Sequence, residues 1–217
     1  MTTSTHARVL RRARCGGRPP LFLALIATLF ACGGAVPDND VTADTQSDVE
    51  RDPQLVFWSS LESLCGQAFQ GRVTESVPPD PSFEGQRLVM HVRSCDLAEI
   101  RIPFHVGEDR SRTWVMTPTS VGLRLKHDHR HEDGSEDEVT QYGGDTLGQG
   151  AATAQDFFAD AVTANLVPEA ATNVWTVEVR SGELFAYALR REGTDRRFRV
   201  EFDLTQPVDP PPPPWGG

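Results

Sequence analysis

Apolar and polar positions alternate along most of the chain between residues 55 and 205. Six longer segments follow this period of two: 87–95, 99–106, 121–131, 173–181, 183–191 and 196–204. With shorter segments at 69–73, 113–117 and 138–142, the pattern predicts about nine strands that are mostly buried on one side. Short turns between them favour an antiparallel meander. Because a meander leaves sheet edges exposed unless it closes, we expect an all-β domain, a lipocalin-like β-barrel with one or two short helices.

Two segments have helical spacing instead. In "LVFWSSLESLC" the side chains of Phe57, Leu61 and Leu64 fall on one face, which predicts a short helix at the start of the domain. In "TAQDFFADAVTANLVPE" Thr153 is the predicted N-cap and Pro168 the predicted end of a second helix. The glycine-rich "YGGDTLGQG" before it lacks the Gly-Lys-Ser/Thr ending of phosphate-binding loops and is predicted to be an ordinary loop.

The stretch from Leu64 to Leu204 is similar to a group of uncharacterised exported bacterial proteins. The similarity is carried by "RIPFHVGEDRSRTWVMT", "LKHDHRHEDGSEDEVTQYGGDT" and "FRVEFDLTQPV". It covers most of the predicted barrel and implies no activity. The first strand lacks the GxW motif of lipocalins, so the likeness to that family is one of architecture alone.

Residues 1–31 have the composition of an export signal. They contain five arginines, no acidic residue and an apolar run from Leu21 to Ala31. This run is shorter than the roughly 20 residues that a helix needs to cross a bilayer.

The sequence "LFAC" at the end of this run, followed by Gly33, resembles the lipobox of bacterial lipoprotein precursors. The resemblance implies that Cys32 becomes an acylated N-terminus, which anchors the protein in the membrane through its lipid. Gly33, in place of Asp, implies the outer membrane of the cell envelope, with the domain facing the periplasm. The alternative is ordinary cleavage near Ala31 or Ala35, which would give a free periplasmic or secreted protein.

Composition divides the remaining chain into three parts. Residues 32–54 are acidic and lack aromatic side chains, so they are predicted to be a disordered tether behind Cys32. Residues 55–205 form the barrel domain. Residues 206–217 form a proline-rich tail with Trp215 near its end, which either meets a proline-binding partner, rests on the barrel or extends freely.

Two of the four cysteines, Cys65 and Cys95, lie in the predicted domain. Since thiols of exported proteins are oxidised, we expect these two to form a disulfide. A two-cysteine metal site is the alternative, although neither has a second cysteine at CxxC spacing.

Charge excludes one class of partner. Removal of the signal takes away five of the 21 basic residues and none of the 31 acidic ones, so the mature net charge is 16 minus 31, or -15. Nucleic acid is therefore not an expected partner, because binding it requires a basic face.

The segment "LKHDHRHEDGSEDEVTQY" carries the most distinctive side chains. With Asp133-Gly134 as a two-residue turn, His127 lies opposite Thr140, His129 opposite Glu138 and His131 opposite Glu136. The three imidazoles then continue the inward face of Leu123 and Leu125.

Two or three imidazoles with a carboxylate are ligands that suit Zn(II) or another divalent metal. One interpretation is therefore a metal site from His127, His129 and His131, completed by Glu138 or Glu136. The same neighbours could make a pH sensor. The third interpretation is a solvated hairpin tip with no chemistry, because opposite charges across strands stabilise such tips modestly.

Together these features predict an envelope lipoprotein whose barrel binds a small apolar ligand or a divalent metal. A metal-dependent hydrolase that uses the histidines is the enzymatic alternative, and no catalytic residue is assigned. A purely structural or interaction lipoprotein is the third, with an unknown protein partner. An interior filled by aromatic side chains would favour a scaffold, whereas a cavity would favour ligand binding.

Overall fold

The computed structural model of the protein describes residues 52–217. The predicted export signal, Cys32 and the tether up to residue 51 lie outside the described residues. The helices are α2 (Pro53–Glu62) and α3 (Ala161–Leu166), with short 3-10 turns η1 (Pro81–Phe83) and η2 (Pro168–Ala170). The strands are β1 (Ala68–Val77), β2 (Leu88–His91), β3 (Ser94–Cys95), β4 (Ile100–Val106), β5 (Asp109–Thr119), β6 (Gly122–His129), β7 (Tyr142–Asp145), β8 (Ala154–Ala159), β9 (Asn173–Arg180), β10 (Leu184–Arg191) and β11 (Arg197–Val208). Neither helix in this part of the chain is both long and apolar enough to span a bilayer.

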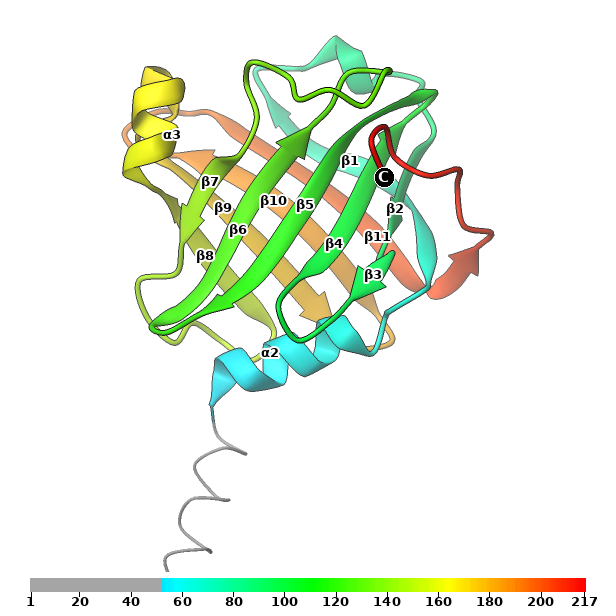
Figure 1. Cartoon of the computed structure of the whole chain (residues 1–217), viewed down its shortest axis with the longest axis horizontal. Helices are drawn as coiled ribbons and strands as arrows, with labels where there is room; N and C mark the ends of the chain where they lie inside the picture. The colour runs from blue at the N-terminus through cyan, green and yellow to red at the C-terminus, as the bar shows by residue number, and fades with distance from the viewer. Residues whose placement is uncertain (1–51) are drawn as a thin grey trace, which may run out of the picture. The chain divides into compact units, whose positions relative to one another are not determined.

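The strands close into a barrel, as the alternating pattern predicted (Figure 1). Neighbours from β4 to β11 pair antiparallel in sequence order, β11 pairs with β1, and β1 with β2. The barrel closes because β2 also pairs with β4, through Leu88 opposite Val106 and Met90 opposite Phe104. Among residues 52–217, ten strands form the barrel wall and β3 pairs only with β4.

Large apolar side chains fill the inside of the barrel. Trp114, Trp175, Phe185 and Phe202 are all at most 4% exposed. Helix α2 lies across one end of the barrel (Figure 1). Its side chains Phe57 and Leu61, from the predicted apolar face, are fully buried in the same core.

The predicted disulfide is present and ties the end of α2 to β3. The bond joins Cys65 and Cys95, whose Cα atoms are 6.2 Å apart. Since β3 pairs only with β4 among the described residues, this bond also holds the start of the barrel wall against the helix.

The second helix is shorter than the sequence predicted. Its first half is strand β8, in which Phe157 is fully buried opposite Trp175 of β9. Helix α3 starts only after Asp160, whose carboxylate accepts a hydrogen bond from the backbone N–H of Thr163 over 2.8 Å. Thr153 is therefore not the cap. The apolar pair at 157–158 fits either period, and pairing with β9 decides in favour of the strand.

The segments on either side of Tyr142 were also assigned wrongly. Residues 138–141, predicted as a strand, are irregular, whereas the first residues of the predicted loop form β7. Strand β7 depends on two glycines. A Cβ on Gly143 would overlap the carbonyl of Leu125, and a Cβ on Gly144 would overlap the carbonyl of Phe158. The absence of these side chains lets both neighbouring strands approach closely.

The C-terminal tail rests on the barrel, one of the arrangements expected for it. Strand β11 continues to Val208, past the predicted domain end at 205. Beyond it, the backbone N–H of Trp215 donates to the carbonyl of Arg110 over 3.1 Å. The Arg110 guanidinium in turn donates to the carbonyl of Pro213 over 3.2 Å. The tail is thus fixed at its far end to the start of β5 (Figure 1).

Candidate ligand-binding pocket

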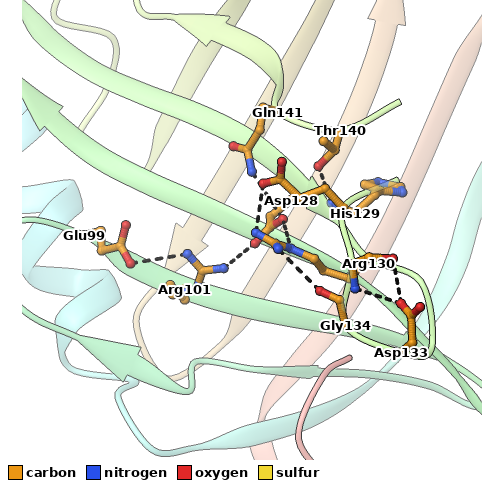
Figure 2. Close-up of polar contacts among 11 residues, drawn as sticks. Glu99, Arg101, Asp128, His129, Arg130, Asp133, Gly134, Thr140 and Gln141 are labelled. Atoms are coloured by element: carbon orange, nitrogen blue, oxygen red, sulfur yellow. Dashed lines mark hydrogen bonds and ion pairs between the residues drawn. The ribbon is translucent and has the colours of Figure 1, made fainter. Parts of the chain in front are cut away.

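We call residues 125–142, which contain the three neighbouring histidines, the histidine hairpin. Its outward side carries a network of ion pairs (Figure 2). The carboxylate of Asp128, which is 4% exposed, accepts hydrogen bonds from Arg101 over 2.5 Å and from Arg130 over 2.8 Å. Gln141 donates to the same carboxylate over 3.2 Å. Arg130 also pairs with Glu136 at 3.0 Å. These contacts hold the hairpin against β4 and occupy Glu136, one of the predicted metal ligands.

The inward side of the hairpin buries His127. Its Nδ1 lies 3.1 Å from the carbonyl oxygen of Tyr142, and its Nε2 lies 2.7 Å from the hydroxyl of Tyr187. Burial lowers the pKa of His127 to about 3, so the ring is neutral. A carbonyl can only accept, so Nδ1 carries the proton and donates. Nε2 therefore accepts from the Tyr187 hydroxyl, and both ring nitrogens are occupied.

His129 forms a second pair with a tyrosine. Its Nε2 lies 3.1 Å from the hydroxyl of Tyr142, whose ring also stacks on His127 at 4.5 Å between centroids. Burial and the nearby Arg112 lower the pKa of His129. Burial raises the pKa of Tyr142 to about 12 and that of Tyr187 well above its usual value. Both histidine–tyrosine pairs are consequently uncharged at neutral pH.

The structure does not assemble the predicted metal ligands. The register of the hairpin is shifted by two residues, so that His127 lies opposite Tyr142 and not opposite Thr140. His131 and Glu138 are exposed at the tip. Within residues 52–217, no group of three or more His, Cys, Asp or Glu side chains is arranged to hold a metal ion. The two inward histidines meet tyrosines, whereas the prediction placed Thr140 opposite His127 and Glu138 opposite His129.

A pocket of about 150 Å³ opens at the end of the barrel away from α2. Aromatic side chains make up much of its wall: Phe83, Phe104, Trp114, Tyr142, Tyr187 and Phe198. Its floor is a stack, in which Trp114 lies 4.4 Å from Tyr187 and 4.9 Å from Phe104 between ring centroids. His127 and His129 also line the pocket. The site is therefore mainly apolar, with a few polar groups at fixed positions.

Arg112 is the principal charged group in this pocket. It lies on β5 two positions before Trp114 and faces inward, with 28% of its side chain exposed. One of its nitrogens donates to the carboxylate of Asp109. A guanidinium has five N–H groups, so Arg112 keeps donors for another acceptor. Arg196 and Asp80 lie at the rim of the same pocket. A hydrogen bond from Ser82 lowers the pKa of Asp80, with a smaller contribution from Arg196 and Arg112.

Two residues of this site were predicted from the sequence. Alternation placed His127 and His129 on the inward face, and both line the pocket. Arg112 was not predicted as a site residue, although the sequence "DRSRTWVMT" places Arg112 on the same face as Trp114 and Met116. A charged side chain on the same face as buried apolar residues departs from the usual pattern of burial. Phe83 could not have been found, since it follows no period.

No protein-family model matches the chain, and no curated protein or solved structure matches it either.

Proposed function

We propose that the barrel binds a small, mainly apolar molecule, a single planar ring with one hydrogen-bond acceptor, in the pocket at its open end. The observation that carries the proposal is an aromatic pocket of about 150 Å³ with the inward guanidinium of Arg112 in its wall. An apolar cavity of about this size is sufficient for benzene. The ring would lie on Trp114 and Tyr187, and its acceptor would receive a hydrogen bond from Arg112.

The protonation states of the pocket favour binding over catalysis. A general acid or base works best when its pKa lies near the operating pH. Burial instead moves the pKa of His127 to about 3 and that of Tyr142 to about 12. Neither group exchanges protons readily at neutral pH. The hydrolase alternative also requires a metal, and two of its predicted ligands, His131 and Glu138, lie at the exposed tip and not with the buried His127.

Calorimetric titration with phenol tests this proposal. We expect a Kd below about 1 mM, which corresponds to about 4 kcal/mol. Leu189→Trp should fill the pocket and abolish binding, because Leu189 lines it. Arg112→Met should weaken binding about tenfold or more, through loss of a hydrogen bond to a charged group. Arg124→Met on the outer face is the matched control and should leave the Kd unchanged. Equal affinity in Leu189→Trp would refute the proposal.

We further propose that this domain is held at the outer membrane by acylated Cys32. The support is the resemblance of "LFAC" and Gly33 to a lipobox, together with the preceding apolar run. Labelling cells with a radioactive fatty acid tests the acylation. The label should appear on the wild-type protein and disappear in Cys32→Ser. Label retained by Cys32→Ser, or a soluble wild-type protein in the periplasmic fraction, would contradict the anchor.

A further inference from the structure

A second hollow lies beside the pocket, in the barrel wall. It is an open groove of about 500 Å³. Strands β1 and β2 contribute Gly71, Arg72, Val73, Ser76 and Leu88 to its lining, and the chain between them contributes the rest: Pro79, Asp80, Pro81, Phe83, Glu84 and Gln86. Phe83 and Asp80 line both the groove and the pocket. The ring of Phe83 therefore stands where the two spaces meet.

The groove exists because one stretch of the wall lacks a neighbour. Strand β1 pairs with β11 over its whole length, from Ala68 to Val77. It pairs with β2 only over Ala68–Gly71. The chain between the two strands, residues 78–87, carries η1 and Phe83, which lines the pocket at the barrel end. The second half of β1 thus borders the groove and has no paired strand on that side.

The segment Pro79–Gln86, which we call the lid, is weakly attached to the barrel. Its hydrogen bonds are local: Asp80 N–H donates to the hydroxyl of Ser76 over 3.1 Å, and Gln86 N–H to the carbonyl of Phe83 over 3.2 Å. Among the described residues, no hydrogen bond or ion pair joins the lid to any strand from β4 to β11. What holds it down is the Phe83 ring, 4.9 Å from Phe198 and 6.3 Å from Phe104 between centroids.

We infer that the lid opens, and that the site then accepts a ring with an attached alkyl chain. The ring occupies the pocket, and the chain passes the position of Phe83 and lies over Val73 and Leu88 in the groove. Opening the lid breaks the hydrogen bond from Asp80 to Ser76 and the packing of the Phe83 ring, and a ligand chain in the place of that ring restores the packing. This inference rests on the proposed function, because the ring must first bind in the pocket.

A series of para-alkylphenols tests the inference by calorimetry on the wild-type protein. Each methylene that enters the groove should lower the Kd about fourfold, the effect of burying one CH₂ group. The Kd should therefore fall steadily from phenol through ethylphenol and butylphenol to hexylphenol. If phenol binds but longer members bind no better or more weakly, the lid stays closed and the inference is overturned, while the proposed function stands. If phenol itself does not bind, the proposed function fails.

Two variants separate the groove from the pocket. Val73→Thr keeps the side-chain volume but places a hydroxyl in the groove, so it should raise the Kd of hexylphenol severalfold and leave that of phenol unchanged. Val56→Thr on the exposed side of α2 is the matched control, with no effect on either ligand. Phe83→Ala removes the partition, so hexylphenol should associate faster than with the wild type. Equal hexylphenol affinity in Val73→Thr and the wild type would place the alkyl chain elsewhere.

Discussion

Protonation of His127 should destabilise this protein as the pH falls from about 6.5. Burial holds the pKa of the folded-state imidazole at about 3, against an ordinary value of 6.5. The unfolded chain therefore binds a proton at pH values where the folded chain does not. The stabilisation by neutral His127 is fully present above pH 6.5 and is lost as the pH falls toward 3.

The size of the effect follows from the difference between the two pKa values. A shift of one unit in the pKa of a single group corresponds to about 1.4 kcal/mol. Between pH 6 and pH 5 the unfolded imidazole is already mostly protonated, so His127 alone should remove about 1 kcal/mol of unfolding free energy. His105 adds to this loss, because burial lowers its pKa to about 4. The aspartates with lowered pKa values contribute little in this window, because they stay ionised above pH 5.

Urea unfolding at a series of pH values measures the effect. The contribution of His127 is obtained by plotting unfolding free energy against pH and comparing the slope of the wild type with that of His127→Gln. In this variant the side chain can still accept a hydrogen bond from Tyr187. Between pH 6 and pH 5 the unfolding free energy of the variant should fall by about 1 kcal/mol less than that of the wild type. Val121→Thr, which changes an exposed side chain without a titratable group, is the control and should keep the wild-type dependence of unfolding free energy on pH. Identical slopes in the wild type and His127→Gln would refute the burial of a neutral imidazole.

Three further predictions concern stability. Replacing both Cys65 and Cys95 by serine should lower the unfolding free energy by about 3 to 4 kcal/mol, measured in urea, since the disulfide closes a loop of 30 residues. Gly144→Ala should leave little folded protein by circular dichroism, because the methyl group would overlap the carbonyl of Phe158. Truncation after Val208 should lower Tm by several degrees, through loss of the packed tail; an unchanged Tm would show that the tail stabilises nothing.

Alternation predicted the barrel because a period of two survives wherever one face of a strand is buried. Strand β9 shows this directly: Trp175, Val177 and Val179 are each 1% exposed, whereas the side chains at 176, 178 and 180 between and after them are partly or fully exposed. Closure of the sheet was predicted because an open meander would leave its edge strands exposed. What the pattern could not supply was β7, whose "YGGD" contains no alternation. Gly143 and Gly144 lie in a strand there because their lack of side chains lets the backbones of β6 and β8 approach closely. This close approach is seen only in the structure.

The same limit separates the predicted site from the observed one. The inward position of His127 follows from local alternation with Leu125. Its partners do not, because Tyr187 lies 60 residues away in the chain and Tyr142 is brought opposite by a register that irregular residues 138–141 shift by two. Alternation along one strand predicts which face of the sheet a side chain lies on. Which side chains meet at a site depends in addition on the register between paired strands. The metal prediction depended on register, and the pocket depends on it too.

The filled interior restricts the proposed ligand to the mouth of the barrel. Below the layer of Trp114 and Tyr187, side chains such as Phe185 and Phe202 occupy the space that an open lipocalin-like cavity would need. The Tyr187 hydroxyl and both nitrogens of His127 already satisfy one another or the backbone, so this floor is complete without a ligand and gains little by hydrogen bonding to one. Arg112, by contrast, retains donors. Ligands should therefore be distinguished chiefly by their acceptor and by the length of any chain that passes Phe83, and only weakly by substituents on the ring.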